Sequence, residues 1–288
     1  MSSPVIRCCL DDRWLLPGEP AFAPTSGVIA TGEGWFETLR VEAGRPMFLA
    51  AHLERLQRSI ARARDDAEAL LAVEAARRCL STMNAAFTDY PSGRLRLLLS
   101  RDEGRRVVGV GGWQALGEWS EHRSSPSSLE QGIDVVMASF QHPELGFLGK
   151  SASYHWSLAA RQEAQMRGAS EALLVRDGHI IEGATGALAW RRKGRWFVHE
   201  SAAVLPSVTL AALRRTGIIF ELSELPISAL EPNAPQPLEG LVLISALRLA
   251  IAIRSCDGRL LPDATSTAVK WRDALLTEHA MDMTSVRT

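Results

Sequence analysis

The stretch KSASYHWSLAARQEAQMRGASEALLVRDGHIIEGATGAL, residues 150–188, carries the pattern that decides the fold of this chain. After its first residue, Lys150, it continues with good helix formers, which stop at Gly168, a typical residue at the end of a helix. Two apolar runs follow, separated by an Asp-Gly pair at 177–178 that favours a type I′ turn. The stretch therefore predicts a helix soon after the lysine and then a β-hairpin whose far strand ends at Glu182.

The sequence on either side of this stretch extends the same pattern. IDVVMASF (133–140) predicts a strand before it, and ALAWRRKGRWFVHE (187–200) predicts a second hairpin with its turn at Lys193-Gly194. Consecutive hairpins indicate an antiparallel meander rather than a βαβ unit, so a Rossmann fold is disfavoured. VLPSVTLAALRRTG (204–217) then predicts a loop and a short helix, whose first backbone N–H groups could hold an anion.

The first part of the chain predicts a separate mixture of strands and helices. A hairpin is expected where WFETLRV (35–41) and RPMFL (45–49) flank a glycine turn, and two amphipathic helices are expected over 50–87. GRLRLLLSRD (93–102) and VVGVGGWQAL (107–116) predict neighbouring strands.

A polar segment rich in serine and charge separates the two parts. We therefore predict an α+β fold with a small domain at 1–120, a linker at 121–130 and a larger domain at 131–288.

Composition excludes several classes of protein. The chain has 288 residues, 46% of them hydrophobic, and a formal charge of only -1, so no global field would attract nucleic acid or an anionic membrane. Its four cysteines have no CxxC spacing, which argues against a disulfide framework or a zinc site. Early charged residues and the lack of a long apolar run disfavour a signal peptide or a membrane span. We expect a cytoplasmic protein that acts on small molecules and carries no metal.

Three blocks of this sequence resemble the fold-type IV pyridoxal-phosphate (PLP) enzymes, which include the class IV aminotransferases and aminodeoxychorismate lyase. The blocks are GEGWFETLRVEAGRPMFLAAHLERLQRS (32–59), residues 150–188, and LPSVT (205–209) followed by LVLISALRLAIAIRSCDGRLL (241–261). The resemblance implies a two-domain D-amino-acid aminotransferase-like fold with antiparallel strands in the larger domain. It also implies PLP as the cofactor, held in the cleft between the domains, and a homodimer.

The family's cofactor-binding motifs occur in the same order in this chain. The resemblance implies that Lys150 forms a Schiff base with PLP, because an amine is needed to form an imine with its aldehyde. Glu182 would face the pyridine nitrogen and favour its protonated form. Arg55, from the HxxRL motif, would bind the phosphate together with the turn at Val208 and Thr209. His52 in the same motif is expected to pack or hydrogen-bond rather than to catalyse.

Other positions depart from the family pattern. Ala187 replaces a common asparagine, and Ser207 stands where glycine is usual, which removes the easiest route to a left-handed backbone. Near the last block only Ser245 offers a hydroxyl for the phosphate, since Ala246 follows it. These changes leave open a degenerate family member that has lost cofactor binding.

The resemblance predicts an aminotransferase that moves an amino group from an amino acid to a 2-oxo acid. Phe36 and the arginines Arg96 and Arg101 are the candidates for binding the substrate, since a guanidinium suits its carboxylate. Thr38 is a candidate catalytic residue, and aminodeoxychorismate lyases also have threonine there. A 4-amino-4-deoxychorismate lyase that releases pyruvate and 4-aminobenzoate is therefore the alternative. The donor, the acceptor and the preference for D or L substrates are left open by the sequence.

Overall fold

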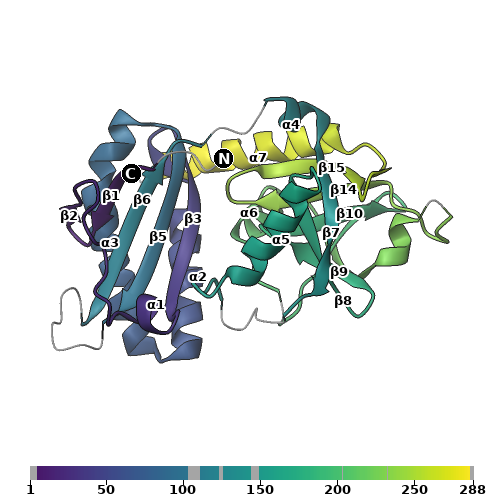
Figure 1. The fold of residues 1–288 in the computed structure, drawn as a ribbon. Coiled ribbons are helices and arrows are strands. Elements are labelled where there is room, and N and C mark those ends of the chain that lie inside the picture. The colour runs from purple at the N-terminus through teal and green to yellow at the C-terminus, as the bar shows by residue number, and fades with distance from the viewer. Residues whose placement is uncertain are drawn as a thin grey trace. The chain divides into compact units, whose positions relative to one another are not determined.

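The computed structural model of this chain describes residues 5–102, 111–122, 126–143, 149–202, 204–231 and 233–285. By their contacts these residues form two compact units (Figure 1). The described residues up to 122, together with 149–154, form the N-terminal unit, and residues 126–143 and 155–285 form the C-terminal unit. The predicted larger domain, 131–288, differs from this division because it included 149–154.

The N-terminal unit is built on a six-stranded antiparallel sheet with the strand order β2-β1-β6-β5-β3-β4. Its strands are β1 (Val5–Leu10), β2 (Arg13–Trp14), β3 (Gly34–Glu42), β4 (Arg45–Pro46), β5 (Gly93–Arg101) and β6 (Trp113–Ser120). Its helices are α1 (Gly27–Ala30), α2 (Leu49–Ala63) and α3 (Asp66–Asp89). The predicted hairpin, the two helices and the strand at 93–102 are confirmed. Of the strand predicted at 107–116, residues 107–110 lie outside the described part.

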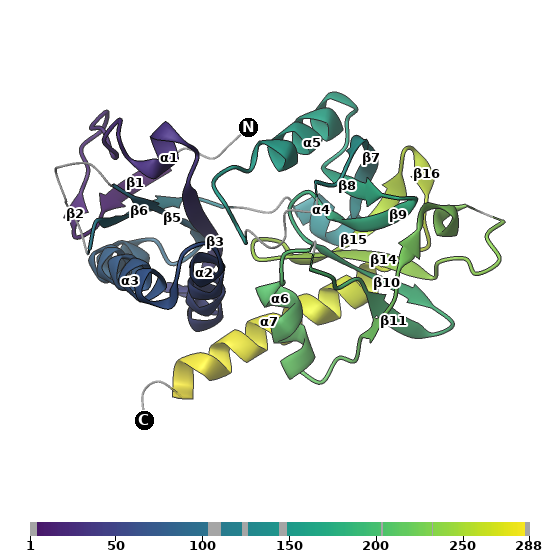
Figure 2. The same cartoon turned by 90° about the horizontal axis from the view of Figure 1, so that it is seen from below.

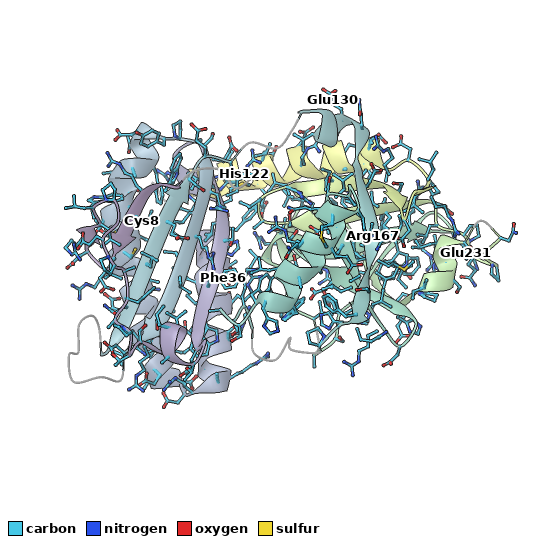
Figure 3. All side chains as sticks on the ribbon, viewed as in Figure 1. Cys8, Phe36, His122, Glu130, Arg167 and Glu231 are labelled. Atoms are coloured by element: carbon cyan, nitrogen blue, oxygen red, sulfur yellow. The ribbon has the colours of Figure 1, made fainter. Side chains whose placement is uncertain are left out.

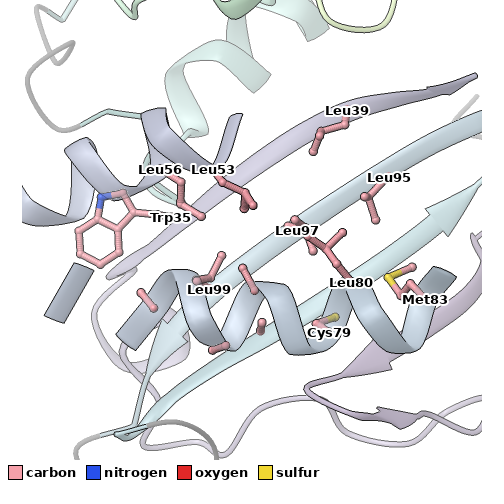
Figure 4. Packing of buried hydrophobic residues seen from close by; sticks show 14 of the residues in the cluster. Trp35, Leu39, Leu53, Leu56, Cys79, Leu80, Met83, Leu95, Leu97 and Leu99 are labelled. Carbon is pink, nitrogen blue, oxygen red and sulfur yellow. The ribbon is translucent and has the colours of Figure 1, made fainter. Parts of the chain in front are cut away.

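One face of this sheet packs against α2 and α3. Alternate side chains of a strand point to opposite faces, so Leu39 of β3 and the odd-numbered leucines of β5 all point toward the helices. Figure 4 shows this core, which includes Leu39, Leu53, Leu56, Cys79, Leu80, Met83, Leu95, Leu97 and Leu99. The opposite face of the sheet therefore carries the even-numbered side chains of β3 and β5.

The segment that contains Lys150 pairs with β3, and this explains why it belongs to the N-terminal unit. The Phe36 N–H donates to the Lys150 carbonyl at 2.8 Å, and the Ala152 N–H donates to the Gly34 carbonyl at 2.7 Å. This edge of β3 is open because β4 pairs only with the other end of the strand. The segment could not be assigned to this unit from local sequence, because strand pairing of this kind joins residues more than a hundred positions apart.

The C-terminal unit is built on a larger mixed sheet, ordered β12-β11-β10-β14-β15-β7-β8-β9-β13, with β16 beside β15. Its strands are β7 (Ile133–Gln141), β8 (Glu171–Arg176), β9 (His179–Gly183), β10 (Ala187–Arg192), β11 (Arg195–Val198), β12 (Glu221–Leu222), β13 (Leu225–Pro226), β14 (Gly240–Ser245), β15 (Leu249–Cys256) and β16 (Arg259–Leu260). Its helices are α4 (Pro126–Gln131), α5 (His155–Met166), α6 (Val208–Arg215), the 3₁₀ helix η2 (Ile227–Leu230) and α7 (Thr265–Ser285). The predicted linker at 121–130 thus contains most of α4, which begins at a proline, a residue suited to the first helical position.

Both predicted hairpins in this unit are confirmed. The turn residues Asp177 and Gly178 have φ values of 48° and 78°, and Lys193 and Gly194 have 49° and 73°, as type I′ turns require. The predicted helix is α5, and just before it the Ser153 hydroxyl donates to the Gly32 carbonyl at 3.1 Å.

The expectation of a meander without a βαβ unit is wrong. Strands β7 and β8 are parallel and are connected through α5, which packs against both of them (Figure 2). Strand β9 pairs with β8 and β13 rather than forming a ladder with β10. The hairpin turns determined only the local pairings, whereas the parallel pairing depended on where α5 packs.

Candidate functional site

Lys150 lies against two aromatic rings in the N-terminal unit. Its Nζ is 4.7 Å from the ring centroid of Phe36 and 4.8 Å from that of Tyr154. The two rings meet edge to face at 5.2 Å, and Phe36, labelled on β3 in Figure 3, is buried. Aromatic faces attract cations, so these rings hold the half-buried ammonium group and exclude water from part of its surface.

The strand register places three predicted residues near Lys150. Phe36 and Thr38 are even-numbered residues of β3, and Arg96 of β5 lies directly opposite Thr38. The Arg96 guanidinium carbon is 4.8 Å from the centroid of the Phe36 ring, so two cations share this aromatic side chain. The Arg96 Nε is buried and has no hydrogen-bond partner among the described residues. The structure therefore brings Phe36, Thr38 and Arg96 to the face where Lys150 lies.

The other predicted arginine of this strand is not brought to Lys150. Arg101 is odd-numbered, and its Nε lies 3.2 Å from the Glu68 carboxylate of α3, on the helix-covered face. Arg96 and Arg101 are five residues apart, and positions an odd number apart on a regular strand point to opposite faces. Arg96 and Arg101 were both predicted to bind the substrate, and the structure places them on opposite faces of the sheet.

Arg55 forms a buried ionic cluster on the helix-covered face. Its Nε and Nη2 donate to the two carboxylate oxygens of Glu37 at 2.8 and 2.5 Å, and the Nδ1 of His52 lies 2.8 Å from Glu37. Glu37 and His52 are almost fully buried, and Arg55 is 8% exposed. The expected hydrogen-bonding role of His52 is confirmed.

Sequence reasoning missed Glu37 as the partner of the HxxRL motif. The spacing of three residues puts His52 and Arg55 on one face of α2, which faces the odd-numbered side chains of β3. A charged residue among those odd-numbered positions was therefore a signal that a buried ion pair had to form. In the structure, the Arg55 guanidinium is oriented by Glu37.

The cluster strongly perturbs the titration of its members. Burial alone would raise the pKa of Glu37, but the charges and hydrogen bonds of Arg55 and His52 lower it from the usual 4.5 to about 2. Burial lowers the pKa of His52, and the Glu37 carboxylate partly offsets this shift. Glu37 is therefore ionised throughout the physiological range.

We expect the protein to lose stability in acid because of this cluster. The pKa of Glu37 in the folded protein lies below its value in the unfolded chain. Its contribution to the free energy of unfolding is therefore complete above pH 4.5 and is lost as the pH falls toward 2. The difference of about 2.5 pH units corresponds to about 3 kcal/mol. His52 acts in the same direction below its ordinary value of 6.5, because the fold disfavours its protonation.

Urea unfolding at pH 7, 4.5 and 3 measures this effect. The Glu37→Gln variant, which lacks the titrating carboxylate, should show a shallower decline in the free energy of unfolding between pH 4.5 and 3. An equally steep decline in the variant would assign the acid sensitivity to other groups.

The C-terminal unit holds Glu182 on β9. One carboxylate oxygen, Oε1, lies 3.0 Å from the Nε2 of His142, a residue directly after β7 that is 1% exposed. The other oxygen, Oε2, has no hydrogen-bond partner in the part of the chain that the structure describes. Glu182 is 9% exposed. The carboxylate is thus fixed from one side and retains an acceptor for a further donor.

The predicted phosphate loop forms the start of α6. Ser207 has φ -80°, so the serine in place of glycine requires no left-handed backbone, and its hydroxyl accepts from the Leu210 N–H at 3.2 Å. Among the described residues, the N–H groups of Val208 and Thr209 have no hydrogen-bond partner. Unpaired N–H groups at a helix start suit an anion.

Ser245 lies beside a buried cluster that sequence reasoning missed. The Ser245 hydroxyl accepts from the backbone N–H of Arg248 at 3.4 Å, and the Arg248 Nη1 lies 3.3 Å from the Glu171 carboxylate. Glu171 is fully buried, which raises its pKa, and it also accepts from the Thr185 hydroxyl. Glu171 therefore connects the turn after Ser245 to the loop after Glu182.

Two of the positions that depart from the family pattern lie close in sequence to this cluster. Ala187 is the first residue of β10, is buried and pairs with Ile244 of β14, so this position contributes to the sheet. Ala246 follows Ser245 in the turn between β14 and β15.

Two other kinds of feature, a metal site and a membrane-spanning helix, are absent from the described residues. They contain no group of three or more His, Cys, Asp or Glu side chains arranged to hold a metal ion. Every helix in this part of the chain is too short or too polar to cross a membrane.

Comparisons with known proteins give consistent matches. The family model for amino-transferase class IV matches residues 34–256. The bifunctional aminodeoxychorismate lyase / D-amino acid transaminase of Mycobacterium tuberculosis is 28% identical over 281 residues, which cover 88% of this chain and 92% of the relative.

Solved structures match over nearly the whole chain. A fold IV-transaminase from Curtobacterium pusillum has a TM-score of 0.76 at 25% identity, covering 94% of this chain and 98% of that one. A hypothetical aminotransferase from Mycobacterium tuberculosis in a PLP-bound form has a TM-score of 0.77 at 22% identity, covering 96% and 99%. The expected two-domain fold is therefore confirmed.

Proposed function

Because the chain belongs to the class IV aminotransferase family, we propose that it is a PLP-dependent aminotransferase that moves an amino group from an amino acid to a 2-oxo acid. The observation that carries the proposal is the amine of Lys150, which lies against two aromatic rings on the same sheet face as Arg96. This face offers both a nucleophile and a cation for a carboxylate.

The described residues fit PLP in three respects. Lys150 supplies the amine for covalent attachment, Oε2 of Glu182 can accept from a pyridine N–H, and the N–H groups of Val208 and Thr209 can donate to a phosphate. Ser245 adds a hydroxyl for the phosphate. The Arg55 guanidinium, whose orientation Glu37 fixes, stays a candidate for the phosphate, although its charge is already paired with that of Glu37. When bound, PLP supplies the electron sink that makes proton removal from an amino acid possible.

Each residue on the Lys150 face has a proposed role. Lys150 would hold the cofactor covalently and, once released, its Nζ would take the proton from the α carbon of the amino acid and deliver it to C4′ of PLP. Phe36 and Tyr154 shield this amine from water. Thr38 presents a hydroxyl on the same sheet face and stays a candidate catalytic residue, while Arg96 would bind a substrate carboxylate.

A cofactor titration tests the proposal. The purified protein is incubated with PLP, freed of excess and examined by absorbance before and after addition of pooled L- and D-amino acids. We expect a visible absorption band that disappears on amino-acid addition, and amino transfer once a 2-oxo acid is supplied. A folded protein without such a band would overturn the proposal and favour a degenerate scaffold.

A second candidate function is supported by the bifunctional relative, whose name includes aminodeoxychorismate lyase, and by Thr38. Aminodeoxychorismate added to the PLP-loaded protein without a 2-oxo acid distinguishes the two reactions. Release of pyruvate would establish the lyase, and its absence together with amino transfer would establish the aminotransferase alone.

Replacing Arg96 by glutamine should weaken substrate binding. Removing a charge-assisted hydrogen bond to a carboxylate costs about 1.5–3 kcal/mol, so KM should rise on the order of 10- to 100-fold. The effect on kcat should be smaller, because Arg96 does not move a proton. Steady-state kinetics measure both constants.

Arg101→Gln is the matched control, since Arg101 lies on the same strand but faces α3. Its KM should stay close to that of the wild type. An equal rise in both variants would contradict the assignment of Arg96 to the substrate carboxylate.

A further inference from the structure

The roles proposed for PLP binding do not account for the buried contact between His142 and Glu182. Their side chains approach to 3.0 Å although they come from the ends of β7 and β9, which are separated in the sheet by β8. An ionised carboxylate can only accept hydrogen bonds, so the His142 Nε2 must be the donor to it. The Nδ1 is then the second ring nitrogen and carries no part of this contact.

His142 is held in place by its backbone and by its ring. Its N–H donates to the Val175 carbonyl at 2.8 Å, and its own carbonyl accepts from the Arg176 side chain at 2.9 Å. The ring packs edge to face against Trp156 with 5.4 Å between centroids. A ring restrained in this way directs its Nε2 to one position.

Both strands are irregular where they carry this pair. The register between β7 and β8 shifts between Met137 and Gln141, the residue just before His142. The register between β8 and β9 shifts next to Glu182, between Leu174 and Val175. β-Bulges re-aim side chains and are common beside active sites. These two irregularities are what allow side chains from non-adjacent strands to meet.

We propose that His142 is a positioning residue for Glu182: its Nε2–H donates to Oε1, which fixes the orientation of the carboxylate and leaves Oε2 to accept from the pyridine nitrogen of PLP. This inference rests on the proposed function. Without this donor, the Glu182 carboxylate, which is 9% exposed, would lose the hydrogen bond that orients it. A Glu182 carboxylate that is turned away could no longer accept a hydrogen bond from the pyridine nitrogen.

Affinity for two cofactors tests this role without an activity assay. Wild type, His142→Leu and His142→Gln are titrated with PLP and with its 1-deaza analogue, in which C–H replaces the pyridine nitrogen. We expect His142→Leu to weaken PLP binding about 10-fold, because one charge-assisted hydrogen bond is lost. The affinity for the analogue should stay unchanged within about twofold. His142→Gln, whose amide can donate, should recover most of the PLP affinity.

His179→Leu is the matched control, because His179 lies on the same strand as Glu182 and its ring contacts the Asp177 carbonyl. It should bind both cofactors like the wild type. If His142→Leu weakens the affinity for PLP and for the analogue equally, the role of His142 is merely structural and the inference is overturned. The proposed function still stands in that case, provided that the wild-type protein binds PLP. Failure of the wild type to bind PLP would overturn both.

A measurement on the wild-type protein covers the case in which the leucine variant does not fold. The ¹⁵N spectrum of the histidine side chains, with His142 assigned by its absence in His142→Gln, should show Nε2 carrying a proton at pH 7. An unprotonated Nε2 would exclude the donor role and overturn the inference.

Discussion

Replacing Lys150 by alanine should abolish covalent attachment of PLP and reduce turnover by at least about 10³-fold, because the amine both holds the cofactor and moves a proton. The fold should survive. The Lys150 side chain contacts two aromatic rings, and losing these contacts costs about 1–2 kcal/mol. The strand pairing of this segment uses the Lys150 carbonyl, which alanine keeps.

Borohydride reduction followed by peptide mass mapping measures the attachment. The chain contains only three lysines, Lys150, Lys193 and Lys270, so a single labelled peptide identifies the residue. Lys270→Ala is the control, because Lys270 is exposed on α7. We expect the wild type and this control to be labelled once at Lys150 and Lys150→Ala to be unlabelled. A label on Lys193 or Lys270 in the wild type, or normal turnover in Lys150→Ala, would rule out the assigned mechanism.

Replacing Glu37 by alanine should destabilise the protein by about 3–5 kcal/mol. The change leaves the Arg55 guanidinium nearly buried without its carboxylate partner, and removing one member of a buried ion pair exposes the full desolvation cost of the other. Urea unfolding monitored by circular dichroism measures the difference in the free energy of unfolding.

The exposed pair between Glu54 and Arg58 on α2 provides the control. Its atoms approach to 2.9 Å, close to the distances in the buried cluster, but both side chains are more than half exposed. Glu54→Ala should therefore cost less than about 1 kcal/mol. A similar small cost for Glu37→Ala would show that the buried cluster contributes little to stability.

The order of the family motifs named several residues of the candidate site, because each belongs to a short motif whose residues are close in sequence. The structure describes the surroundings of Lys150, of Glu182 and of the start of α6, and their roles toward PLP stay proposals. Glu37 was harder to recognise. Glu37 matters because it binds His52 and Arg55 of α2. These contacts can be inferred from the sequence only after the side chains of β3 have been assigned to the two faces of the sheet.

The sequence by itself determined the local elements of this protein: its hairpin turns, its amphipathic helices and the order of its motifs. Turn type and helix periodicity depend on residues a few positions apart, so the Asp177-Gly178 turn could be predicted from two letters. Only the tertiary structure decided that Arg96 joins Lys150 while Arg101 faces α3, and that His142 meets Glu182 across β8. These contacts depend on strand register and bulges, and both are fixed by packing between distant segments rather than by local preference.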